Sequence, residues 1–140
     1  MTDLKKAAQK LVEKQKIAYI STLSQDGYPN TKAMLAPRKH ENFKVFYFTT
    51  NTSSMRVRQI RENNKGCIYF SDNLFFKGVM FTGHFEVLED SASKEMIWKK
   101  GDTMYYPKGV TDPDYCVLKF TALKGRIYSN LSTNDFSVDE

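Results

Sequence analysis

Residues 17–34 have the sequence IAYISTLSQDGYPNTKAM, which is the clearest signal of the fold in this chain. The run over residues 17–24 is rich in β-branched and aromatic side chains, and such residues favour a strand. Asp26 and Gly27 follow it, and an Asp-Gly pair between two strand-like runs is a strong signal for a β-hairpin. The second strand is expected over about residues 30–36, ending before Pro37. This stretch therefore predicts antiparallel β-structure near the start of the chain.

Further strands and short helices are predicted on both sides of this hairpin. The apolar residues before it have the spacing of an amphipathic helix capped by Thr2, and they are Leu4, Ala7, Ala8, Leu11 and Val12. A charged turn at 38–42 leads to a strand at 43–50, which would complete a three-stranded meander. A short helix is expected from Met55 to Asn63. The later elements are strands at 66–72 and 75–89, a helix at 91–100, and strands at 115–122 and 125–130. Gly78 and Gly83 are candidate bulges or bends in the long strand.

The order of these elements indicates the fold class. It lacks the strand–helix alternation of doubly wound folds. An antiparallel sheet of about seven strands is expected to close into a barrel, because closure hides the sheet edges. The sequence therefore predicts a mainly β protein, a β-barrel with flanking helices. We expect one domain over residues 1–130, followed by a loose polar tail at 131–140.

Composition argues against several classes of protein. No apolar run approaches the roughly 20 residues that span a bilayer, and the lysine-rich start lacks the apolar segment of a signal peptide. We therefore expect a cytoplasmic protein with no membrane partner, in which Cys67 and Cys116 are buried free thiols. The formal net charge is +5, but five of the lysines fall in the first 16 residues, on what should be a solvated helix face. Such dispersed charge does not favour nucleic-acid binding.

The segment from Phe48 to Arg58 has the strongest chemical character. A strand ends there, hydroxyl residues fill the turn, and a helix begins with Arg56 in its first turn. The free N–H groups and the dipole of a helix start favour an anion, and a guanidinium suits phosphate. A simpler interpretation is that Ser53 or Ser54 only caps the helix and that the arginines form a solvated face. On these residues alone, the simpler interpretation is favoured.

Other candidate residues are weaker. Lys32, in the second strand, matters only if the fold brings it near Arg56. His40 and His84 have no further ligand at metal-binding spacing, so no metal is expected. Tyr105 and Tyr106 could line a pocket mouth, although ordinary packing of a long connection explains them more simply. No nucleophile motif, phosphate loop or carboxylate pair is present, so no catalytic residue is identified, and a cofactor would have to supply any redox chemistry.

Four segments, in order and spacing, resemble the pyridoxamine 5'-phosphate oxidase-like family of FMN-binding split barrels, and most closely its general stress protein branch. They are IAYISTLSQDGYPNTKAM at 17–34, FYFTTNTSSMRVRQIREN at 46–63, MFTGHFEVLED at 80–90 and YYPKGVTDPDYCVLKF at 105–120. The resemblance implies a six-stranded split barrel and a homodimer with two flavins at its interface.

The resemblance also implies a set of cofactor contacts and favours the phosphate interpretation over a simple cap. Ser54 and Arg56 match the family's Ser-x-Lys, which binds the FMN phosphate, and Lys32 matches a basic position on the second strand. The implied FMN contacts in chain order are Lys32, Ala33, Met34, Phe48, Thr49, Thr50, Ser53, Ser54 and Arg56. Ala33 and Met34 would offer backbone groups to the isoalloxazine ring.

Two departures from the family pattern argue against the namesake reaction. Lys77-Gly78 stands where true pyridoxamine phosphate oxidases have Arg-Gln, and Arg126-Ile127-Tyr128 lacks the histidine of their Arg-x-His. The expected function is an FMN-dependent oxidoreductase with an unidentified small-molecule substrate. The alternatives are a non-catalytic flavin-binding or flavin-buffering stress protein, or a related barrel that binds haem, through His84, or a deazaflavin.

Overall fold

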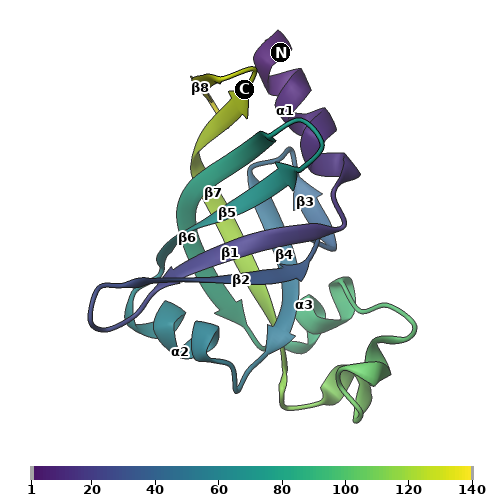
Figure 1. Cartoon of the computed structure of the whole chain (residues 1–140). Coiled ribbons are helices and arrows are strands. Elements are labelled where there is room, and N and C mark those ends of the chain that lie inside the picture. The colour runs from purple at the N-terminus through teal and green to yellow at the C-terminus, as the bar shows by residue number, and fades with distance from the viewer. Residues whose placement is uncertain (1, 140) are drawn as a thin grey trace.

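The computed structural model describes residues 2–139, and its strands form one curled antiparallel sheet (Figure 1). The order of strands in the sheet is β2-β1-β5-β6-β7-β4-β3, with β8 added beside β7. Along the chain the elements are α1 (Asp3–Lys14), β1 (Ile17–Leu23), β2 (Pro29–Leu35), β3 (Lys39–Glu41), β4 (Val45–Asn51), α2 (Met55–Glu62), β5 (Lys65–Asp72), β6 (Lys77–Leu88), α3 (Ser91–Met96), two 3₁₀ turns (Asp102–Met104 and Gly109–Thr111), β7 (Tyr115–Ser129) and β8 (Ser132–Phe136). The prediction of a mainly β barrel with flanking helices is confirmed, with eight strands in place of about seven.

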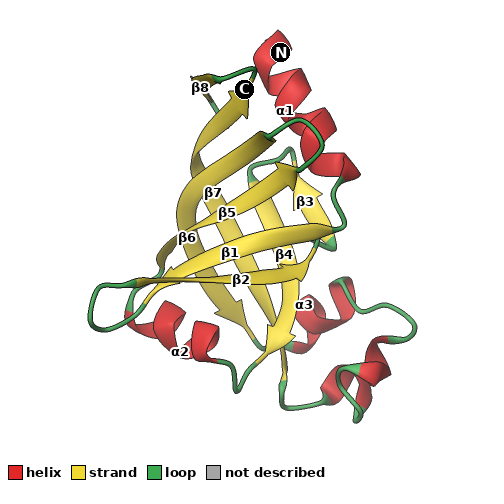
Figure 2. Cartoon of the chain, viewed as in Figure 1, coloured by secondary structure: helices red, strands yellow, loops and turns green. Residues whose placement is uncertain are grey.

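The helices lie at the ends of the barrel (Figure 2). The helix α1 lies near the C-terminus at one end, whereas α2 and α3 lie near the other. Among residues 2–139, none of the helices combines the length and apolar character needed to cross a bilayer.

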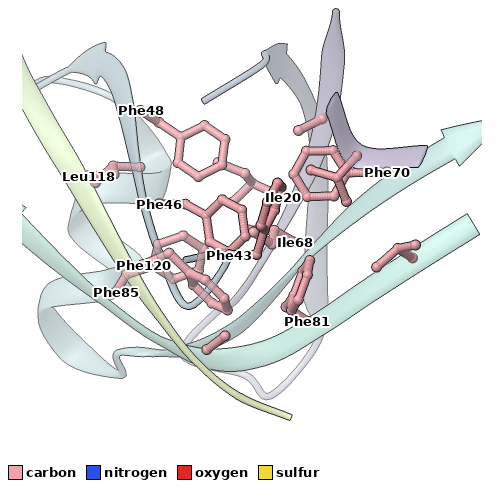
Figure 3. Close-up of a cluster of buried hydrophobic side chains, with 14 of the residues drawn as sticks. Ile20, Phe43, Phe46, Phe48, Ile68, Phe70, Phe81, Phe85, Leu118 and Phe120 are labelled. Carbon is pink, nitrogen blue, oxygen red and sulfur yellow. The ribbon is translucent and has the colours of Figure 1, made fainter. Parts of the chain in front are cut away.

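Phenylalanine side chains from several strands fill the barrel (Figure 3). The rings of Phe46 and Phe81 have centroids 5.0 Å apart, and those of Phe85 and Phe120 are 4.8 Å apart. Each of these four side chains is at most 1% exposed. Tilted aromatic pairs at such separations add to the stabilisation from apolar burial. Most phenylalanines of the sequence are therefore packed in one core, whereas Tyr47, Tyr106 and Tyr115 belong to a second buried cluster.

One of the two candidate bulges is present. The pairing of β6 with β7 shifts its register between Thr82 and Gly83, and a Cβ on Gly83 would lie 2.0 Å from the carbonyl oxygen of Thr121. Glycine is therefore required where the long strand bends. Of the two alternatives predicted for Gly78, a bulge or a bend, the bulge is wrong, because this residue pairs regularly on both sides. Glycine at this position leaves room for the side chain of Tyr69. A Cβ on residue 78 would lie 1.9 Å from the Tyr69 hydroxyl oxygen, which is too close.

Local signals near the N-terminus are largely confirmed. The backbone N–H of Lys5 donates to Thr2 Oγ1 at 3.2 Å, as expected for a helix cap. A tight turn at Asp26 and Gly27 joins β1 to β2, and Gly27 has a φ of +86°. The expectation that the N-terminal lysines are all solvated is wrong for Lys5, which is 1% exposed.

The predicted meander of the first three strands is wrong. The strand β2 pairs with β1, but β4 pairs with β3 and β7, so among residues 2–139 no ladder joins β2 to β4. After Pro37 the chain crosses to the far edge of the sheet, where Arg38 N donates to Tyr47 O at 2.8 Å. The charged segment at 38–42, predicted as a turn, therefore contains the short strand β3.

Several predicted element boundaries in the second half are also wrong. The two strands predicted at 115–122 and 125–130 are one strand, β7. The described part of the predicted tail, residues 131–139, is not loose, because β8 pairs with β7 and Val138 is buried; residue 140 lies outside the described residues. The long strand begins at Lys77, and α3 ends at Met96. Each error concerns residues whose conformation depends on a strand or loop distant in sequence.

Candidate anion-binding site

The turn between β4 and α2 ends in a well-formed helix cap. Ser54 has an extended backbone, and its Oγ accepts a hydrogen bond from Val57 N at 3.4 Å. The capping role proposed for Ser54 is therefore present. The first backbone N–H groups of a helix have no partner within the helix, so those of Met55 and Arg56 still point toward the turn. The cap and an anion site can coexist at this helix start.

Arg56 is a half-buried cation with unused hydrogen-bonding capacity. Its Nη2 donates to Thr50 Oγ1 at 2.9 Å, which ties the helix back to the end of β4. Its Nε is buried and has no hydrogen-bond partner, and no carboxylate within residues 2–139 forms an ion pair with it. Burial lowers the pKa of the Arg56 guanidinium, but a guanidinium stays charged at any pH a protein meets. A desolvated cation without a counterion favours an anionic ligand.

The residues at the end of β4 differ in their burial and in the side chains that they contact. Thr50 is buried beneath Arg56, and Thr49 lies next to Tyr106. Burial raises the pKa of Tyr106, although a hydrogen bond with Thr49 acts in the opposite direction. Phe48 is completely buried, its ring points into the core (Figure 3), and it pairs with Leu118 of β7, so the structure gives it no exposed group with which to contact a ligand.

Tyr105 and Tyr106 differ in their surroundings. Tyr106 is 4% exposed and packs against Tyr115, with ring centroids 4.7 Å apart, while Tyr105 is half exposed. Ordinary packing, the simpler explanation of this pair, holds for Tyr106.

The candidates on β2 lie on an edge strand. Lys32 and Ala33 are exposed, and Met34 packs partly against the core. Lys32 pairs with Ile20 of β1, and α2 also contacts β1, through a hydrogen bond of 2.6 Å from Thr22 to Gln59. The fold thus places β2 and α2 against the same strand. No hydrogen bond or ion pair joins Lys32 to Arg56 in the described part of the chain.

Asp114 also belongs to this region, although it was not among the residues predicted for the site. Its Oδ1 accepts from Ser53 N at 2.8 Å, its Oδ2 accepts from Asn51 Nδ2 at 2.9 Å, and its carbonyl oxygen accepts from Thr52 N at 2.8 Å. The hydrogen bond from Asn51, followed by those from Ser53, lowers the pKa of the Asp114 carboxyl group. The link depends on the pairing of Asn51 with Tyr115, which follows Asp114 at the start of β7.

A second unforeseen feature is a buried ion pair. Arg38 Nη1 and Nη2 each lie 2.8 Å from one oxygen of Asp102, and Nη1 also donates to Ile97 O at 3.1 Å. The side chains of the pair are 9% and 5% exposed. Arg38 lowers the pKa of Asp102, whose Oδ2 also accepts from Lys99 N. The ion pair links the segment before β3 to the connection between α3 and β7, close to Tyr106.

The histidines and cysteines form no comparable cluster. Within residues 2–139, no group of three or more His, Cys, Asp or Glu side chains is arranged to hold a metal ion. Cys116 is buried, and burial raises the pKa of its thiol, which makes it a poor nucleophile. Cys67, expected to be buried, is only half-buried. His40 stacks on Phe43, with centroids 3.9 Å apart.

Comparison with known families gives a match over most of the chain. The family model described as pyridoxamine 5'-phosphate oxidase matches residues 4–129. Comparison with curated proteins found no significant match.

Solved structures share both the fold and, in one case, much of the sequence. A protein related to general stress protein 26, of the pyridoxinephosphate oxidase family, from Clostridium acetobutylicum is 44% identical, with a TM-score of 0.89 over 97% of this chain and 95% of that one. General stress protein 26 from Bacillus anthracis is 21% identical, with a TM-score of 0.78 over 96% of this chain and all of that one. A heme-binding protein from Mycobacterium smegmatis is 13% identical, with a TM-score of 0.77 over 99% of this chain and 60% of that one. The last two show a common fold only.

Proposed function

This chain belongs to the pyridoxamine 5'-phosphate oxidase family, and from that premise we propose that it binds FMN at the start of α2. The observation that carries the proposal is Arg56, a half-buried cation with a free Nε and no carboxylate partner among residues 2–139. A phosphate group would supply the missing counterion. The hydroxyl of Ser54 and the first backbone N–H groups of α2 would supply further donors.

The donor set also suits the rest of the cofactor. Among residues 2–139 no strand pairs with the outer edge of β2, so the outward-facing backbone groups of Ala33 are available to the polar edge of a flavin ring. Met34, next to it, pairs with Ala18 of β1. Lys32 is exposed on the same strand. Thr49 and Thr50 would lie beneath the cofactor at the end of β4, with Ser53 in the turn.

FMN would supply the redox chemistry, since it can accept and release one or two electrons. The chain's own residues would bind the phosphate, orient the ring and limit access to it. We therefore propose an FMN-dependent oxidoreductase acting on a small molecule. The absence of any acid–base pair in the sequence motifs is consistent with a protein that leaves the chemistry to its cofactor.

A pyridoxine phosphate substrate is not favoured. The two positions that depart from the family pattern are direct cross-strand partners, since Gly78 of β6 pairs with Tyr128 of β7. The hydroxyl of Tyr69 fills the space where a side chain at residue 78 would lie, and its ring stands 6.3 Å from that of Tyr128. Two aromatic rings therefore lie where a side chain at residue 78 and the family's substrate-binding histidine would be.

The visible spectrum of the purified protein tests the cofactor. We expect a yellow protein with flavin bands in the blue and near ultraviolet, from which denaturation releases a compound with the mass of FMN. A protein that is colourless and remains so after addition of FMN would contradict the proposal. A Soret band would indicate haem, and a single violet band a deazaflavin. Bound FMN that neither NADH nor NADPH reduces would favour the non-catalytic alternative.

We further propose a homodimer with the flavin at its interface. Large apolar side chains at two neighbouring turns line one groove: Phe75 and Phe76, between β5 and β6, are 65% and 92% exposed, and Leu131, after β7, is fully exposed. Ile17 and Leu35, a cross-strand pair on β1 and β2, are each about half exposed. Exposed apolar patches of this kind are typical of protein interfaces.

Sedimentation equilibrium tests the dimer. We expect a mass of twice the 16.2 kDa of one chain at micromolar concentration. A stable monomer that still binds FMN would contradict the proposed interface.

A further inference from the structure

Asp114 controls the shape of the turn that leads into α2. Its carboxylate and its carbonyl oxygen hold three consecutive residues, Asn51, Thr52 and Ser53, with distances of 2.8–2.9 Å. The next backbone N–H, that of Ser54, donates to Asn51 O at 3.0 Å. The N–H groups of residues 52–54 are therefore all engaged within the chain.

This arrangement leaves the turn without free backbone N–H groups that could bind a phosphate. Its backbone donors are occupied, so binding is left to the groups that follow, namely the hydroxyl of Ser54, the start of α2 and the Arg56 guanidinium. What the turn contributes is their placement. We propose that Asp114 is a positioning residue that holds the start of α2 in the geometry that binds the FMN phosphate, an inference that rests on the proposed function.

A purely electrostatic view makes the opposite prediction. Asp114 carries a negative charge close to the expected site of a phosphate, and like charges repel. The hydrogen bonds that it accepts keep its pKa low, so it stays ionised at neutral pH. If repulsion dominated, removal of the carboxylate would strengthen FMN binding. If positioning dominates, removal weakens FMN binding, so the sign of the change separates the two.

The experiment compares FMN with riboflavin, which has the same ring system but no phosphate. Flavin-free Asp114→Ala protein is titrated with each flavin, followed by flavin fluorescence. We expect the FMN dissociation constant to rise about tenfold, the lower end of what loss of a supporting partner costs at metal sites. The riboflavin dissociation constant should stay within about twofold of the wild-type value, because the ring contacts are untouched.

Two further variants make the test decisive. Asp90→Ala removes an exposed carboxylate that caps the start of a different helix, α3, and should leave FMN binding unchanged. Asn51→Ala removes only the contact to Asp114 Oδ2 and should weaken FMN binding in the same direction by a smaller factor. If Asp114→Ala does not fold, Asn51→Ala decides the question.

Unchanged or tighter FMN binding by Asp114→Ala and Asn51→Ala would overturn the positioning role. An equal loss of affinity for FMN and riboflavin would also overturn it, because general distortion does not single out the phosphate. Wild-type protein that binds no FMN would overturn the proposed function itself, and the inference with it.

Discussion

Replacing Arg56 with alanine is expected to weaken FMN binding about 100-fold, equivalent to about 2.7 kcal/mol. The variant loses the charge and the planar donors that would face the phosphate. The apo protein should keep its stability, because Arg56 has no carboxylate partner within residues 2–139 and is partly desolvated. Fluorescence titration of the apo protein measures the affinity, and urea denaturation measures the stability.

Arg58 offers a matched control. It lies on the same helix but is exposed, so Arg58→Ala should change FMN affinity by no more than about twofold. Riboflavin binding should be equal in wild type and Arg56→Ala. If Arg56→Ala binds FMN as tightly as wild type, the simpler interpretation of this segment is correct: Ser54 caps the helix, and the arginine has no ligand.

Replacing Arg38 with alanine should lower the free energy of unfolding by about 3–5 kcal/mol, the usual cost of leaving one charge of a buried pair without its partner. Asp102 would remain buried beside the α3–β7 connection with two of its hydrogen bonds lost. Urea denaturation at neutral pH measures the change. The exposed pair Arg126–Asp135 is the control, and Arg126→Ala should lower the free energy of unfolding far less than Arg38→Ala does. A cost for Arg38→Ala as small as that of the control would contradict a structural role for the buried pair.

The same ion pair predicts an acid-sensitive stability. Arg38 holds the pKa of folded Asp102 below its ordinary value of 3.8. A carboxylate with a lowered folded pKa contributes stability above the unfolded pKa, and that contribution is lost as the pH falls through the folded pKa. The contribution of Asp102 should therefore be constant at neutral pH and disappear below about pH 4. Asp102→Asn should lose less stability than wild type between pH 5 and pH 2.5, as urea denaturation at each pH would show.

Features determined by a few neighbouring residues were predicted well from the sequence. The turn at Asp26 and Gly27, the cap at Ser54 and the bulge at Gly83 all depend on local backbone preferences. The pairing of strands was predicted less well, because nothing near Leu35 shows that β4 pairs with β7 and not with β2. The prediction of two separate strands, with a break between residues 122 and 125, was also wrong. Gly125 lies inside the continuous strand β7, and Phe136 of β8 occupies the space beside it.

By itself, the sequence determined the fold class, the family resemblance and the turn-and-helix segment from Asn51 to Arg56, because alternation, capping and turn chemistry act over a few residues. Only the tertiary structure decided what surrounds that segment. Asp114 lies 61 residues after the Ser53 that it contacts, and Asp102 lies 64 residues after Arg38. Such pairs form when β4 and β7 come together. Likewise, the lack of a carboxylate partner for Arg56 among residues 2–139 follows from which side chains the folded barrel brings near it, and no local pattern contains that information.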